Sequence, residues 1–178
     1  MKGVGLGLAI ILLASLFVGC ISDVEDTTKS AKTNARGSLS NPASIRESVV
    51  VTTSSGTFEI TVVDAIRGEK AYQIVKRGNK YNPEPEKDYE YLLVKVRCRY
   101  LSGDSSYYVS RLNFNAYCDG AGYSPKYVTL PNDYPEFKSV NLMPGGEVKG
   151  WIVYTIPKGE NAMIAYEHMF EPVCFIRV

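Results

Sequence analysis

Short segments that alternate apolar and polar side chains dominate the chain after residue 48, and they set its fold class. In the clearest of them, Tyr91–Tyr100, Leu92 and Val94 alternate with Leu93 and Lys95. A period of two is typical of half-buried antiparallel strands. The same pattern predicts further strands at residues 49–51, 57–63, 71–75, 111–118, 123–129, 148–156, 162–166 and 174–178. No long apolar stripe of helical period is present, so we expect no helix in this region.

Turn-forming residues separate these segments. Asp119-Gly120 and Pro144-Gly145-Gly146 are examples, and each favours a change of chain direction. Many short strands joined by glycine and proline turns predict an all-β fold over residues 49–178. We expect an antiparallel β-sandwich, with a small β-barrel as the alternative.

The N-terminus has the pattern of an export signal. Lys2 supplies positive charge, and the stretch from Gly3 to Gly19 is uncharged and mostly apolar. It ends in Gly19-Cys20, which resembles the lipobox of prokaryotic lipoproteins. The resemblance implies a signal peptide over 1–19, cleavage between Gly19 and Cys20, and a lipid such as palmitate on Cys20. The alternative is an uncleaved signal anchor over Gly3–Ser22, and both place the rest of the chain outside the cytoplasmic membrane.

The segment over 20–48 is rich in small polar residues and poor in large apolar ones. Such a composition cannot bury a core, so we predict a flexible linker between Cys20 and a folded domain over 49–178. Its acidic and basic residues balance, so it has no basic patch for anionic lipid.

Charge and histidine content exclude several classes of function. The formal net charge of the whole chain is +1, which argues against a nucleic-acid partner. His168 is the single histidine, so sites that need two or more imidazoles are excluded. We expect no cofactor and no metal.

A family resemblance rests on an ordered set of motifs. They are Gly56–Val62, Tyr81-Asn82-Pro83, Lys87–Val96, Asp119-Gly120 and Leu142–Gly159. The order resembles an uncharacterised domain family of bacterial and archaeal surface lipoproteins, over about Ser54 to Tyr166. The resemblance implies an immunoglobulin-like β-sandwich of unknown role and transfers no catalytic or ligand-binding residue.

Three cysteines remain if Cys20 carries lipid. A disulfide can persist outside the membrane, and Cys118–Cys174 would fasten the last strand to the sheet. Cys98–Cys174 is the rival pairing, and the absence of any disulfide is the third possibility.

Candidate sites are few. His168 could act as a general base oriented by Glu167 or Glu171, but we expect a surface histidine because no nucleophile motif accompanies it. Carboxylates alternate from Glu84 to Glu90, which predicts a solvated acidic loop rather than a calcium site.

Tyrosine is abundant, with thirteen in the chain. Tyrosine is enriched at binding surfaces, although strands also favour it. The outward-facing Tyr117, with Asn113 and Asn115, is the predicted binding face. The sequence therefore predicts a lipid-tethered extracytoplasmic module, non-catalytic, with a binding or structural role and an unidentified protein or cell-envelope partner. The alternative is an extracytoplasmic hydrolase or other enzyme with an unrecognised site.

Overall fold

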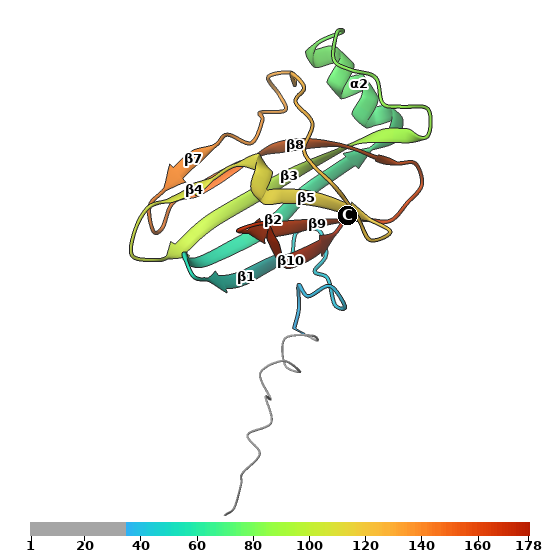
Figure 1. Cartoon of the computed structure of the whole chain (residues 1–178). Coiled ribbons are helices and arrows are strands. Elements are labelled where there is room, and N and C mark those ends of the chain that lie inside the picture. The colour runs from blue at the N-terminus through green and yellow to red at the C-terminus, as the bar shows by residue number, and fades with distance from the viewer. Residues whose placement is uncertain (1–34) are drawn as a thin grey trace, which may run out of the picture.

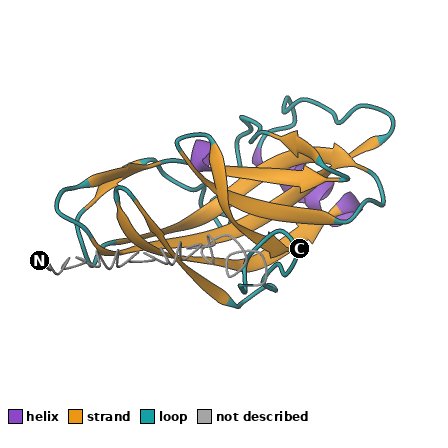
Figure 2. Cartoon of the chain, turned by 60° about the horizontal axis from the view of Figure 1, so that its bottom comes forward, coloured by secondary structure: helices purple, strands orange, loops and turns teal. Residues whose placement is uncertain are grey.

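The computed structural model describes residues 35–178, and its strands form a sandwich (Figures 1 and 2). One four-stranded sheet has the order β1-β2-β3-β8 and the other β10-β9-β5-β6, and β4 and β7 form a two-stranded ribbon. The predicted signal peptide over 1–19, the predicted cleavage between Gly19 and Cys20, and the predicted lipidation of Cys20 all fall outside the described residues. Within residues 35–178 no helix has the length and hydropathy that crossing a bilayer demands.

Most of the strands coincide with the segments in which the alternation predicts them. The strands are β1 (Ser48–Thr53), β2 (Gly56–Arg67), β3 (Tyr89–Ser102), β4 (Tyr107–Val109), β5 (Phe114–Cys118), β6 (Ala121–Tyr123), β7 (Val140–Leu142), β8 (Glu147–Pro157), β9 (Ala162–His168) and β10 (Glu171–Arg177). The two helical elements are α2 (Gly68–Gly78) and the 3-10 turn η1 (Arg111–Asn113). All paired strands of the named sheets run antiparallel. The predicted sandwich is confirmed, and the barrel alternative is wrong.

The main core lies between the two sheets. Alternate residues of β3, including Leu92, Val94 and Val96, are almost fully buried, as the period of two predicts. They face Phe114 and Ile164 of the opposite sheet within one cluster. Burial of these side chains drives the two layers together, because each removes a large apolar area from water.

A second cluster covers the outer face of the first sheet. Helix α2 places Ala71, Ile74 and Val75 on one side, at the spacing of a helix face, against Leu93 and Trp151. The predicted strand over 71–75 is therefore wrong, and so is the expected absence of helices. The helix has only three buried apolar positions, so its period is easily mistaken for a short strand.

Two other predicted strands are shorter than expected. The segment over 111–118 begins with η1, where Ser110 caps the turn and Leu112 points outward, and becomes a strand only at Phe114. The segment over 123–129 leaves the ladder after Tyr123 and continues as an irregular chain.

Residues 35–47 form a strap along β10, so the prediction of a flexible linker as far as 48 is wrong for this part. The amide of Ala43 donates to the Phe175 carbonyl at 3.0 Å, and Arg177 donates to Ala43 at 2.8 Å. Ala43 is fully buried, and the Arg36 guanidinium binds the Glu47 carboxylate. That hydrogen bond lowers the pKa of Glu47 to about 2. Burial of Pro42 and Ala43, with Ile45 packed against the main core, docks the strap together with these bonds.

The hairpin between β9 and β10 has an unusual turn. His168 pairs with Glu171, so Met169 and Phe170 are the two central residues. Both have a positive φ, 51° and 67°, which a two-residue hairpin of this hand requires. Asparagine and glycine adopt this conformation at low cost, whereas other side chains pay roughly 1 kcal/mol each.

Replacing the two turn residues tests this assignment. The double change Met169→Asn with Phe170→Gly should raise the free energy of unfolding by about 1–2 kcal/mol, because both side chains are exposed and contribute little packing. Urea unfolding measures the change. Phe170→Ala is the control and should change stability by less than about 0.5 kcal/mol. A stability loss in the double variant would show that the turn prefers Met-Phe.

Candidate functional site

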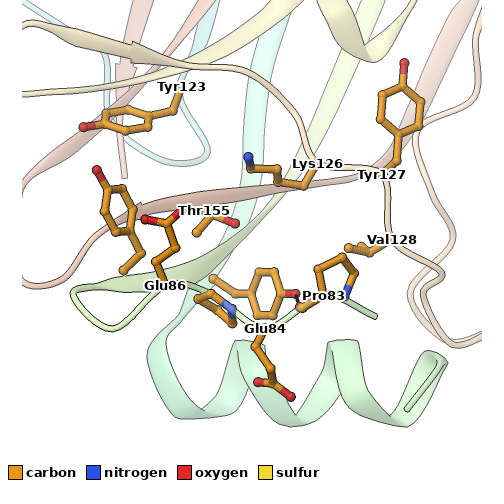
Figure 3. A pocket seen from close by; sticks show the side chains of 11 residues that line it. Pro83, Glu84, Glu86, Tyr123, Lys126, Tyr127, Val128 and Thr155 are labelled. Atoms are coloured by element: carbon orange, nitrogen blue, oxygen red, sulfur yellow. Dashed lines mark hydrogen bonds between the residues drawn. The ribbon is translucent and has the colours of Figure 1, made fainter. Parts of the chain in front are cut away.

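A tyrosine-lined groove lies at the end of the sandwich next to α2 (Figure 3). Its volume is about 350 Å³, within the range of small-molecule sites. The loop from Pro83 to Glu86 forms one wall, and the segment from Lys126 to Val128 forms another. Four tyrosines line it: Tyr89, Tyr91, Tyr123 and Tyr127.

One buried asparagine holds the two walls in place. The Asn82 side-chain amide donates to the carbonyls of Val75 and Thr129, at 2.8 Å each. Its oxygen accepts from the Thr129 amide at 3.0 Å. The Tyr91 hydroxyl donates to the Pro83 carbonyl beside it. A single side chain thus connects the last turn of α2, the start of the loop and the far wall.

The tyrosine rings present both edges and faces. Tyr89 and Tyr123 meet nearly edge to face, with ring centroids 6.3 Å apart. The Arg111 guanidinium stacks over Tyr127, 3.7 Å from the ring centroid, and restrains this exposed side chain. The groove therefore offers stacking surface whose orientation is set before a ligand arrives.

Two charged side chains of the groove are uncompensated. Within residues 35–178, Glu86 and Lys126 make no side-chain ion pair or hydrogen bond, and Figure 3 shows both reaching into the space near Tyr123. Glu84 differs, because it pairs with Lys76 at 2.5 Å and accepts from the Tyr72 hydroxyl at 3.2 Å. The hydrogen bond from Lys76 lowers the pKa of Glu84.

The predicted solvated acidic loop is thus only partly correct. Glu84 is paired with Lys76, and Glu90 accepts from the Arg67 Nε at 3.0 Å. Glu86 and Asp88 have no side-chain partner among the described residues, and only Glu86 of the two lines the groove. Across residues 35–178 no cluster of three or more histidine, cysteine or acidic side chains is arranged to hold a metal ion.

The predicted binding face is assembled, but around a carboxylate of the protein itself. Asn115 Nδ2 and the Tyr117 hydroxyl each donate to the Glu167 carboxylate at 2.8 Å, and Asn113 Nδ2 donates to the Glu167 carbonyl at 3.3 Å. Glu167 is buried, and the other three are half-buried. Burial and the bond to Glu167 raise the pKa of Tyr117 to about 12. These polar groups stabilise a buried charge instead of facing a partner.

His168 is buried, so the expectation of a surface histidine is wrong. Its Nε2 lies 3.1 Å from the Ser54 Oγ, and its Nδ1 lies 3.3 Å from the Tyr107 hydroxyl. A serine beside an imidazole is the arrangement of a nucleophile and a base. The group at Nδ1 is a phenol, however, and the Glu167 carboxylate binds Asn115 and Tyr117 instead. Ser54 is 114 residues away in sequence, so no local motif announces the contact.

The predicted Cys118–Cys174 disulfide is wrong. Cys98, Cys118 and Cys174 are free and buried. Cys174 lies opposite Tyr166, and Tyr166 lies opposite Phe114, so Cys118 is four residues further along β5. At about 3.3 Å per residue the offset is about 13 Å, beyond the roughly 7 Å limit between bridged Cα atoms. The rival Cys98–Cys174 bond is not formed either.

The cysteines should therefore be unreactive in the folded protein. Burial raises the pKa of Cys98 and of Cys174 to about 12, and it also raises the pKa of Cys118. At pH 8 we expect iodoacetamide to modify these thiols at least about a hundredfold more slowly than after unfolding in guanidinium, because the thiolate is the reactive form. Mass spectrometry of the alkylated peptides measures the rates. A non-reduced peptide joining two of these cysteines would contradict the free-thiol assignment.

Comparison with solved structures shows the fold. The YcdA protein of Bacillus subtilis, provisionally described as a lipoprotein, superposes with a TM-score of 0.52 and 18% identity. The match covers 71% of this chain but only 37% of YcdA. The secreted protein MPT63 of Mycobacterium tuberculosis gives a TM-score of 0.53 and 12% identity, over 77% of this chain and 98% of its own. The YjhA protein of Bacillus subtilis gives a TM-score of 0.53 and 14% identity, over 76% of this chain and 98% of its own.

The family assignment rests on sequence. No curated protein matches the chain. The match to a family covers residues 49–172, which includes every strand of both sheets except the first residue of β1 and most of β10. It also includes both walls of the groove. The family resemblance drawn from the motifs is confirmed: the chain belongs to the family described as a domain of unknown function, DUF4352.

Proposed function

We propose that the protein is an extracytoplasmic lipoprotein, tethered to the membrane through Cys20, whose sandwich is a non-catalytic binding module. The groove is its ligand site. The observation that carries this proposal is the pairing of a preformed tyrosine wall with two uncompensated charges, Glu86 and Lys126. Both side chains are exposed, so their charges are solvated in the free protein and available to charged groups of a ligand.

The groove chemistry favours an amino acid or a short peptide as the ligand. Lys126 suits a carboxylate, Glu86 suits an ammonium, and the tyrosine rings suit an apolar side chain. A volume of about 350 Å³ admits a molecule of this size. No serine, cysteine or histidine lines the groove, and we propose binding without turnover as its activity.

The location rests on the N-terminal pattern. The Gly19-Cys20 end of the apolar segment favours lipidation over a plain signal anchor. The structural neighbours support an extracytoplasmic place, since one is provisionally described as a lipoprotein and another as secreted. The hydrolase alternative rests on the Ser54–His168 contact alone, at the other end of the sandwich from the groove.

The tether is tested by Cys20→Ser. Without the thiol the lipid cannot attach, so we expect either release of the protein from membranes or accumulation of the uncut precursor. Cell fractionation with intact-mass measurement distinguishes these. Ser22→Ala is the matched control and should leave the lipidated mature form unchanged. Membrane-bound Cys20→Ser protein at mature size would contradict the lipoprotein proposal.

The groove is tested by removing one charge at a time. The ligands are a panel of dipeptides and tripeptides. Glu86→Gln should weaken the binding of peptides with a free amino group about tenfold or more. Lys126→Met should weaken the binding of peptides with a free carboxylate by a similar factor. Calorimetric titration measures the affinities. Glu171→Gln and Lys149→Met are controls with the same charge change outside the groove, and they should bind normally. Equal binding by all four variants would contradict the groove as the site.

A further inference from the structure

Figure 1 shows β4 and β7 at the end of the sandwich away from α2. Large exposed apolar side chains lie on the elements and turns of this end. We call this the apolar end, and its exposed residues are Leu101, Tyr108, Met143, Met169 and Phe170. Phe170 is 95% exposed and Met169 is 73% exposed. They come from the end of β3, from β4, from the turn after β7 and from the β9–β10 hairpin.

Hydrogen bonds join the turns and strand ends of the apolar end to one another. The Tyr100 hydroxyl donates to the carbonyls of Ser55 and Ser105, at 2.9 Å each, and the Gly145 amide donates to the Tyr100 carbonyl at 2.6 Å. His168, next to Met169, contacts both the Ser54 hydroxyl and the Tyr107 hydroxyl. The apolar end is thus a fixed surface and not a set of separate loops.

The hairpin does not need its side chains for folding. Met169 and Phe170 occupy left-handed backbone positions that asparagine and glycine fill at lower cost, and their side chains are exposed. A strained turn that displays two large apolar groups is unfavourable for the isolated domain. Such a cost is typical of a functional surface.

We infer that the apolar end docks into the lipid bilayer to which the chain is tethered, with Phe170 and Met169 at the depth of the headgroup–acyl boundary. The inference rests on the tethering proposed above. The 14 residues between Cys20 and Ala35 can span at most about 50 Å, so the tether would keep the domain within that distance of the bilayer. Ala35 lines the same hollow as Pro172 and Val173, which directly follow the hairpin in β10.

The charge of the apolar end favours lipid over an electrostatic partner. Its turns, residues 53–56, 102–106, 143–146 and 169–170, contain no lysine or arginine. Docking is therefore driven by apolar burial and needs no anionic lipid. Because β3 has 14 residues, about 45 Å, and runs between the two ends, docking would hold the groove well clear of the surface.

The experiment uses the full chain reconstituted into phosphatidylcholine vesicles with brominated acyl chains, which quench tryptophan only at close approach. Phe170→Trp places a reporter at the apolar end. Tyr81→Trp is the matched control, a largely exposed aromatic position near the groove end. The wild-type protein has only the buried Trp151 and gives the baseline level of quenching. We expect about twofold quenching of the reporter at position 170, none beyond baseline at position 81, and no change when anionic lipid is added.

The other outcomes overturn the inference in distinguishable ways. A wild-type chain that fails to float with the vesicles has no tether, and this outcome counts against the proposed function. Flotation without quenching at position 170, or equal quenching at both positions, overturns docking of the apolar end. A concentration-dependent dimer in sedimentation that Phe170→Ser abolishes would instead assign this surface to a second copy of the chain.

Discussion

Strand β3 must bury both of its faces over its first half, and the rest of the structure follows from this demand. Tyr91, Leu92, Leu93 and Val94 are consecutive and all are buried. Leu92 and Val94 face inward and join the main core. Tyr91 and Leu93 face outward and must be covered by other side chains. Helix α2, Trp151 and Leu130 supply it. Further along β3, basic residues return to the outer face, and the sheet there faces water.

The groove forms because helix α2 covers the outer face of β3. The helix sits on the sheet, so the chain must return from its last turn to the start of β3, and the loop of Pro83 to Glu86 does this. Asn82 satisfies three backbone groups at the point of return. Unsatisfied buried backbone groups are costly, so the return path is fixed and the walls of the groove with it.

The sequence revealed most of the strands but little of the site. The alternation in Thr57–Val63, Tyr91–Tyr100 and Val148–Ile156 reports burial directly, so these strands could be predicted. Trp151 is out of phase with its apolar neighbours in the strand, and in the structure it belongs to the second cluster. The helix over Gly68–Gly78 was missed because its buried residues are few and follow a glycine.

Contacts between distant segments could not be predicted. Tyr117, Asn113 and Asn115 alternate as an exposed face would, and only the partner strand shows that Glu167 fills the space between them. The burial of His168 depends on Ser54 and Tyr107 in the same way. The groove residues come from four separate segments and share no motif. In each case the information lies in strand pairing, which sequence periodicity does not specify.

The strap also has a mechanical consequence. Any pull transmitted along the chain from its N-terminal side arrives first at Arg36, whose guanidinium binds Glu47, and then at the amide ladder from Gly37 and Ala43 to β10. The load therefore enters an edge strand of one sheet, while the groove is built mainly on the other sheet and on the loops beside α2. In a tethered protein, as proposed above, a pull on the N-terminal side would therefore load β10 before it reached the groove.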